Sequence, residues 1–580
     1  MWAGLYSLKS RQPEGKKLTY TGLVCHFLFL ILLGFYGCSE QNADNNFPIT
    51  SNLAMLKGRV SDKNGPVSGA VVRLKTTDTF TQSDNEGNFT LQFVQDGTPC
   101  LITAWAEGYY ITGGSEYKPG DTNIELFLEH HSSEDNPDYT WVSAYACAGR
   151  PNNCENCHSA QSDSGNLPFD EWRNDAHALS AENIRFLTMY LGTDVSGNTS
   201  PTTVYTSHRE YGSIPLAPDP DLPYYGPGYK LDFPNSAGNC ASCHAPLASI
   251  NDPYGINPVS LEGVHREGIS CDFCHKIIDV KLDQQSGIPN DNMPGVISYK
   301  FRRPFDGHQF FAGPFDDVAP GEDTYSAVQK ESQYCASCHF GSFWDVQIYN
   351  SYGEWLESPY SVGPYKLTCQ DCHMPTGLSD HFAAIDKGGF IRNPETIRSH
   401  RMLGIRDEEF MRNAVSLDAD AILEDNRIAL TVEITNDNTG HHIPTDSPLR
   451  HLILLVVAKD EQGETLELFD GPLLPDWCGK GDPLNGYYAG MPGMAYAKIL
   501  REHWTEKEPT GSYWMQTKIV TDNRIKAFET ASSEYIFSLP QNGNVSVSIR
   551  LIYRRAFIEL KDQKGWEIPD MTLASVTLYL

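Results

Sequence analysis

The chain has 580 residues, a length that fits about three or four domains. Hydrophobic residues make up 40% of it and aromatic residues 11%, which argues against disorder and predicts packed cores. The formal net charge of −30 would repel phosphate backbones, so it argues against nucleic acid as a partner and favours solubility and basic partners.

The first 38 residues have the pattern of an export signal. A basic start precedes the apolar run 22–37, which is short for a transmembrane helix, and Cys38 follows directly. The basic residues of this start are Lys9, Arg11, Lys16 and Lys17. The arrangement resembles a bacterial lipoprotein signal over residues 1–38, which implies lipidation of Cys38 and a membrane anchor. A plain secretory signal or an uncleaved anchor is the alternative.

The predicted location follows from this signal. We expect an exported protein at the outer membrane, at the cell surface or in the periplasm. The mostly polar residues 39–54 would serve as a tether.

Residues 55–130 predict an all-β module. Apolar and polar residues alternate between Gly, Asn and Asp turns, as in "NGPVSGAVVRL" and "SDNEGNFTL". These stretches, with Pro66, Gly69, Ala70 and Val72, resemble the carboxypeptidase-regulatory-like sandwich. The resemblance implies a spacer or docking module without catalytic residues. A peptidase is excluded, because the segment has no zinc-peptidase ligand set.

Five copies of C-x-x-C-H dominate residues 131–410. They are Cys154, Cys157 and His158; Cys240, Cys243 and His244; Cys271, Cys274 and His275; Cys335, Cys338 and His339; and Cys369, Cys372 and His373. This motif attaches c-type haem: the thiols bond the vinyl groups and the adjacent histidine reaches the iron. A single copy also fits a zinc knuckle, a redox dithiol or chance. Five copies in an exported chain predict five covalent haems, and no βαβ pattern supports a thioredoxin-like alternative.

The motifs are closely spaced along the chain. Residues 154–373 provide about 44 residues for each haem, too few for a separate core around each one. We therefore expect a mostly α or irregular domain in which neighbouring haems form much of the core. Haems packed in this way predict electron transfer.

The second axial ligand decides between electron transfer and catalysis. Two histidines per iron suit electron transfer, whereas an open position admits substrate. The candidates for distal ligands are His177, His265, His308, His400 and His441. His177 lies on or beside a face with helical spacing over 170–190, and His265 comes six residues before Cys271. His208 and His381 are weaker candidates.

Several segments together resemble a family of exported multihaem c-type cytochromes. They include "YYGPGYKLDFPNSAGNCASCHAP", "FFAGPFDDV" and "YGEWLESPY", and the resemblance spans about residues 140–580. The family is related in style to hydroxylamine oxidoreductase and pentahaem nitrite reductase. The resemblance implies distal roles for His177, which follows Trp172 in W-x₄-H, and for His400, which precedes Gly404.

The resemblance has two departures. Pentahaem nitrite reductase carries its active-site haem on a C-x-x-C-K motif, whereas no motif here is C-x-x-C-K. Hydroxylamine oxidoreductase has a catalytic haem crosslinked to a tyrosine, and no tyrosine here can be assigned that role. Neither enzymatic activity therefore transfers by motif.

After residue 410 the pattern predicts a second β-sandwich, residues 411–580. The predicted strands are 427–436, 449–460, 532–540 and 545–560. The stretch "NTGHHIPTDSP" (438–448) reads alone as a polar turn with two solvated histidines. Its GH-x-x-PT pattern resembles one in the C-terminal part of the same family, which implies that His441, and not His442, caps a haem. Cys100, Cys147 and Cys478 lie outside the motifs and leave a disulfide possible.

Three functions remain open on these patterns. The favoured one is electron transfer to a redox partner protein or an extracellular acceptor, which makes the chain more an electron carrier than an enzyme. The second is reduction or oxidation of a small nitrogen or sulfur compound at one open haem. The third is a homo-oligomer that forms a conductive filament.

Overall fold

The computed structural model describes residues 53–94, 97–146, 153–160, 166–290, 293–305, 307–540 and 543–580. The predicted signal, the predicted lipidation site Cys38, most of the predicted tether and Cys147 lie outside these residues. From Asn52 to Leu580 the chain forms one compact unit, so the predicted boundaries inside it stay predictions. None of the described helices is long and apolar enough to cross a membrane.

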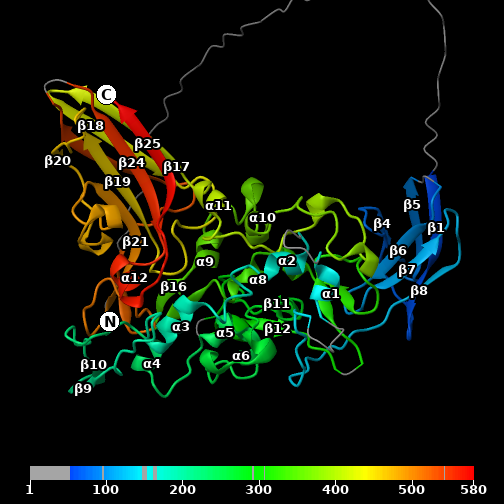
Figure 1. The fold of residues 1–580 in the computed structure, drawn as a ribbon. Coiled ribbons are helices and arrows are strands. Elements are labelled where there is room, and N and C mark those ends of the chain that lie inside the picture. The colour runs from blue at the N-terminus through cyan, green and yellow to red at the C-terminus, as the bar shows by residue number, and fades with distance from the viewer. Residues whose placement is uncertain are drawn as a thin grey trace, which may run out of the picture. The chain divides into compact units, whose positions relative to one another are not determined.

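The N-terminal part consists of two four-stranded sheets, drawn in blue (Figure 1). One has the order β2-β1-β5, with β8 parallel to β1, and the other has the order β4-β3-β6-β7. Exposed and buried residues alternate along β5, so Phe89 and Leu91 face inward. They share one core with Leu56 of β1 and Ile102 of β6, which makes the two sheets a sandwich. The strands are β1 Leu53–Asp62, β2 Gly65–Pro66, β3 Val71–Leu74, β4 Phe80–Gln82, β5 Asn88–Val94, β6 Cys100–Trp105, β7 Thr112–Tyr117 and β8 Ile124–Phe127.

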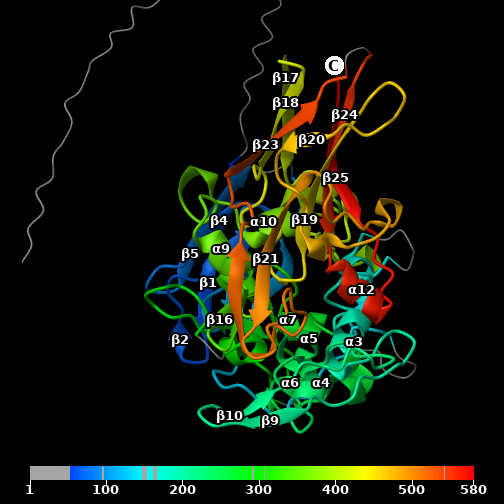
Figure 2. The ribbon, with the colours of Figure 1, turned by 90° about the vertical axis from the view of Figure 1, so that its left-hand side faces the viewer.

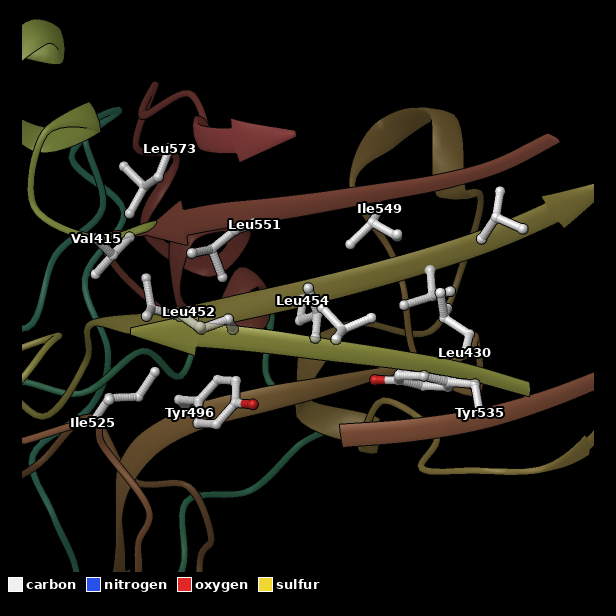
Figure 3. Close-up of a cluster of buried hydrophobic side chains, with 14 of the residues drawn as sticks. Val415, Leu430, Leu452, Leu454, Tyr496, Ile525, Tyr535, Ile549, Leu551 and Leu573 are labelled. Carbon is white, nitrogen blue, oxygen red and sulfur yellow. The ribbon is translucent and has the colours of Figure 1, made fainter. Parts of the chain in front are cut away.

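The C-terminal part has two larger sheets, with the orders β17-β18-β23-β20 and β22-β21-β19-β24-β25 (Figures 1 and 2). Leu430 of β18, Leu454 of β19, Tyr535 of β23 and Ile549 of β24 meet in one core between the sheets (Figure 3). The strands are β17 Ser416–Glu424, β18 Arg427–Thr435, β19 His451–Lys459, β20 Leu468–Asp470, β21 Gly493–Glu502, β22 Thr517–Asp522, β23 Thr530–Ser538, β24 Ser546–Arg554 and β25 Met571–Tyr579.

The predicted strand 545–560 is too long by six residues. β24 ends at Arg554, and α12, Ile558–Lys564, follows. Ile558 and Leu560 are buried on this helix, and Gly565 ends it in the left-handed region at φ 66°. The apolar residues after Arg554 therefore belong to a helix and not to the strand.

The residues between the two β parts form short helices, small two-stranded sheets and irregular segments. The described α-helices are four to eight residues long, so this part of the described chain shows no packed helical domain and fits the irregular half of the prediction better. The helices are α1 Glu155–His158, α2 Pro168–Trp172, α3 Ile184–Leu191, α4 Tyr229–Asp232, α5 Ala241–His244, α6 Pro246–Ser249, α7 Cys271–Cys274, α8 Gln333–Ala336, α9 Ser351–Leu356, α10 Cys369–His373 and α11 Glu408–Arg412. The strands are β9 Tyr205–His208, β10 Gly212–Pro215, β11 Ile277–Val280, β12 Tyr299–Phe301, β13 Phe311–Gly313, β14 Asp323–Tyr325, β15 Gly341–Phe343 and β16 Val346–Tyr349.

The predicted helical face over 170–190 is interrupted. α2 ends at Trp172, α3 begins at Ile184, and His177 lies in the turns between them. The Asp175 carboxylate accepts the His177 amide at 2.8 Å, and the Asn183 side chain accepts two amides at the start of α3. Short polar side chains thus bind the backbone locally in competition with a continuous helix.

Candidate haem-binding site

All five C-x-x-C-H motifs line one cavity of about 2490 Å³. The ten cysteines and the five adjacent histidines all contribute to its wall. A pocket for one drug-sized ligand usually has about 300–1,000 Å³. The cavity is therefore large enough for several large groups.

Short helical turns present the motif side chains. In α10 the Thr368 side chain accepts the Asp371 amide, and Asp371 accepts the Thr368 amide in return, which fixes the start of the helix. In α7 the Ser270 side chain accepts the Phe273 amide in the same way. Residues three and four apart share a helix face, so both thiols of a motif lie on one side.

Each motif histidine turns its Nδ1 atom toward a protein oxygen. The carbonyl oxygens of Phe382, Ala312 and Leu403 lie 2.7, 2.7 and 2.6 Å from Nδ1 of His158, His275 and His373 respectively. Nδ1 of His244 lies 3.4 Å from the Ser180 carbonyl, and Nδ1 of His339 lies 3.4 Å from Asp446 Oδ2. An oxygen acceptor places the proton on Nδ1, which leaves the Nε2 lone pair for a metal ion.

Burial keeps four of these imidazoles neutral. It lowers the pKa of His244 and of His373 to about 4, and it also lowers the pKa of His158 and His275. A neutral imidazole is the form that binds a metal ion. At His339 burial acts in the same direction, but the hydrogen bond and charge of Asp446 raise the pKa to about 9.

Two predicted distal histidines face a motif histidine. The ring centroids of His373 and His441 are 6.3 Å apart with planes at 16°, and those of His177 and His339 are 6.3 Å apart with planes at 66°. Two metal–nitrogen bonds of about 2.0–2.1 Å plus the two ring radii span about 6 Å. The centroid separation of each pair therefore matches the one that a single metal ion between two imidazoles would give.

The Nδ1 atoms of both predicted distal histidines also lie on protein oxygens. Nδ1 of His177 lies 2.7 Å from Asp175 Oδ1, and Nδ1 of His441 lies 3.0 Å from the His442 carbonyl. A proton on Nδ1 leaves the lone pair on Nε2 of each ring, as in the motif histidines.

His400 lies in the cavity wall near two other motifs. Burial and the neighbouring His275 and His158 lower its pKa to about 4. The Glu171 carboxylate fixes its backbone by accepting the His400 amide at 2.7 Å. His400 is therefore placed beside motifs 1 and 3.

The other two candidates do not line the cavity. His265 lies in a 3₁₀ turn, Gly263–Arg266, and its buried Nδ1 has no hydrogen-bond partner among the described residues. His308 is half exposed, and its Nε2 is 3.4 Å from Glu129 Oε1. His208 contacts the ring of Tyr211, and His381 pairs with Asp380 at 2.6 Å.

The motifs have a defined spatial order. Cys154 raises the pKa of Cys271, Cys338 raises the pKa of Cys243, and Cys369 raises the pKa of Cys335, so the two thiols of each pair lie close together. The Tyr334 hydroxyl, next to Cys335, donates to the Cys274 carbonyl at 2.7 Å. Motif 4 thus adjoins motifs 2, 3 and 5, and motif 1 adjoins motif 3.

The supporting carboxylates were not among the sequence predictions. Asp175, Glu171 and Asp446 hold the ring or the backbone of a candidate ligand. Only Asp175 could have been predicted from the sequence, because it lies two residues before His177. The two cysteines outside the motifs that the structure describes, Cys100 and Cys478, are both free thiols.

Comparison with known proteins gives structural likenesses alone. No protein-family model matches the chain, and no curated protein matches it either. A penta-haem cytochrome c552 from Thermochromatium tepidum is similar over 74% of this chain and 97% of its own, with 18% identity and a TM-score of 0.49. A cohesin–X-dockerin complex from Acetivibrio cellulolyticus is similar over 13% of this chain and 58% of its own, with 11% identity and a TM-score of 0.13.

Proposed function

We propose that the protein is an exported pentahaem c-type cytochrome that transfers electrons. The observation that carries the proposal is the common cavity, where each of five motif histidines has Nδ1 on a protein oxygen and two thiols beside it. When bound, a haem iron takes up and releases one electron, and its axial ligands and surroundings set its potential.

The residues present fit covalent haem. The cysteine pairs supply the thioethers, and the anchored imidazoles supply the proximal ligands. Zinc, by comparison, takes four converging donors. Within the described ranges no group of three or more His, Cys, Asp or Glu side chains converges on one point.

We assign distal ligands to two sites and place a third. His441 would complete the site of His373, and His177 would complete that of His339, because these ring pairs have the separation that one metal ion spans. His400 would serve motif 1 or motif 3. Within the described part of the chain, neither His265 nor His308 forms a comparable ring pair with a motif histidine, so we assign neither to a haem.

Mass spectrometry of the purified protein tests the proposal. We expect a mass that exceeds the polypeptide by five haems, and a haemochrome absorbance in proportion. A variant with Cys369 and Cys372 both replaced by Ser should carry one haem fewer. A protein without covalent haem would overturn the proposal.

One observation favours an enzyme as the second candidate. The ring of Phe186 stacks on His244 at 3.8 Å and 3°, and among the described residues no second imidazole faces His244 as His441 faces His373. The site of motif 2 would then keep an open position for a small ligand. A high-spin ferric signal that shifts on addition of nitrite, hydroxylamine or sulfite would support this candidate, and purely low-spin spectra would contradict it.

The location and the partner are further parts of the proposal. Export and lipidation at Cys38 would attach the protein to a membrane, with a redox protein or an extracellular acceptor as partner. Labelling with a radioactive fatty acid should mark the wild type and not a Cys38→Ala variant. Microscopy of the purified protein would decide whether it assembles into filaments.

A further inference from the structure

Arginines line the haem cavity in two distinct groups. Four of them pair with carboxylates: Arg73 with Asp316, Arg392 with Asp317, Arg398 with Asp371, and Arg401 with Asp407. Four others have no carboxylate partner among the described residues, and we call them the arginine wall: Arg185, Arg406, Arg450 and Arg555. The same cavity thus contains four neutralised and four unneutralised guanidinium groups, in a chain of net charge −30.

The fold brings the members of the arginine wall together. His451 pairs with Arg554 in the antiparallel register of β19 and β24, so the next positions, Arg450 and Arg555, lie across from each other. Arg555 donates to the carbonyl of Ile405, the residue before Arg406. Like charges directly opposite each other on neighbouring strands destabilise the pairing.

Protein groups satisfy these side chains only in part. Arg450 donates to the Thr445 carbonyl at 3.1 Å, a neutral acceptor. The nearest carboxylate, Asp446, is already paired with His339. Burial, and then the nearby Arg555, Arg450 and Arg406, lower the pKa of Arg185 to about 10. Among the described residues, the arginine wall therefore has no carboxylate of its own within ion-pair distance, and Asp446, whose charge reaches Arg450, is shared with His339.

We propose that the arginine wall binds carboxylate or oxyanion groups, with the propionates of a bound haem as its occupants. This inference rests on the proposed function for the haem itself. Guanidinium groups bind carboxylates through two parallel hydrogen bonds, which makes arginine the suitable residue. Tyr553, whose surroundings include Arg450, Arg555 and Arg185, adds a hydroxyl group at the same place.

Spectroelectrochemical titration of the haem-loaded Arg450→Gln/Arg555→Gln variant tests this site. Mass spectrometry first establishes that five haems are present, so a failure of the proposed function is recognised separately. We expect the midpoint potential of at least one haem to fall, because loss of positive charge favours the ferric form. Arg412→Gln, which removes a surface arginine paired with Glu408, is the control and should leave all potentials unchanged.

Inorganic phosphate distinguishes the two sources of the anion. If haem propionates fill the site, added phosphate leaves the wild-type midpoint potentials unchanged. The double variant then differs from the wild type in midpoint potential with or without phosphate. If the site takes free oxyanions, phosphate shifts the wild-type potentials saturably and the double variant does not respond. Unaltered potentials in the double variant, with no phosphate response in either protein, would overturn the proposal.

Discussion

The imidazole rings of His373 and His441 lie with centroids 6.3 Å apart and planes at 16°, although one ends α10 and the other lies in the loop after β18. Side-chain hydrogen bonds fix the loop at this point: Asn436 Nδ2 and Thr439 Oγ1 donate to the His441 carbonyl at 2.9 and 2.7 Å. Gly440 lies against the Trp355 ring, where a Cβ atom would come within 3.1 Å. The loop is thus built to hold His441 opposite the last motif.

Replacing His441 with Ala should convert one haem to a high-spin ferric state. The His373 side of the iron would keep its ligand, while the opposite side would lose it. Electron paramagnetic resonance and visible spectra of the oxidised protein measure this change.

The matched control is His442→Ala at the neighbouring position. Nδ1 of His442 lies 3.6 Å from Glu354 Oε1, so this ring is turned toward a carboxylate. We expect its spectrum to match that of the wild type. Identical low-spin spectra for both variants would mean that His441 is not a haem ligand and that "GHHIP" is an ordinary turn.

Glu354 of α9 holds the same loop through hydrogen bonds. Its carboxylate accepts the His442 amide at 3.2 Å and the Thr445 hydroxyl, and it pairs with Arg524 at 2.7 Å. Both charged side chains are almost fully buried. Glu354→Ala leaves Arg524 with Asp522 as its carboxylate partner but removes the acceptor of the His442 amide and the Thr445 hydroxyl, which should lower the free energy of unfolding by about 1–3 kcal/mol.

Glu354→Ala should also raise the high-spin fraction of one haem, since the His441 loop loses an anchor. Chemical unfolding followed by circular dichroism, together with resonance spectra at native conditions, gives both readouts. Glu357→Ala, at the exposed end of the same helix, should change neither. A stable variant with a wild-type spectrum would show that the loop needs no such support.

Local patterns in the sequence predicted the parts of this structure that depend on neighbouring residues. Alternation of apolar and polar residues located β5 and β18, whose inward positions are buried. The C-x-x-C-H spacing located the five motif histidines, which all line the cavity. These features depend on residues within one turn or one strand.

Contacts between distant segments could not be predicted in this way. The partners that aim the imidazoles, such as Asp446 for His339 and Leu403 for His373, come from other parts of the chain. His308 was predicted as a ligand from its aromatic and glycine neighbours in the sequence, yet its ring lies beside Tyr110 and Glu129. Sequence neighbours indicate what a residue is next to along the chain, but not what lies across the cavity.

Lys564 joins α12 to the short helices around the cavity. Its side chain is fully buried, and its ammonium group donates to the carbonyls of Thr188, Thr193 and Pro227. Lys564→Met keeps the apolar stem but leaves these buried acceptors without their donor, which should cost about 3 kcal/mol of unfolding free energy. Denaturant titration measures the loss.

Lys561→Met is the control for this change. Lys561 lies on the same helix, with its ammonium group 3.9 Å from the Asp562 carboxylate at the surface. Such a pair contributes at most about 1 kcal/mol, so this variant should remain close to the wild type. Equal stabilities for the two variants would contradict a structural role for the buried amine.

Asp323 of β14 makes the stability of the protein depend on pH. Burial, and then the charge of Glu322, raise the pKa of this carboxyl group to about 7, although Lys276 and Lys75 act in the opposite direction. An unfolded aspartate titrates near about 3.9, so between about pH 4 and pH 7 the folded state holds a proton that the unfolded state has lost. The contribution of Asp323 is therefore full below about pH 4 and disappears as the pH rises through about 7.

Asp323→Asn removes this titration, since the amide stays neutral at every pH. Its free energy of unfolding should fall less steeply than that of the wild type between about pH 4 and pH 7, and it should exceed the wild-type value at about pH 8. Guanidinium unfolding curves across this range measure both quantities. Asp279→Asn, at a half-exposed carboxylate that pairs with Lys300, should leave the slope unchanged. Parallel curves for the wild type and Asp323→Asn would mean that Asp323 is ionised in the folded protein throughout, with Lys276 and Lys75 outweighing its burial.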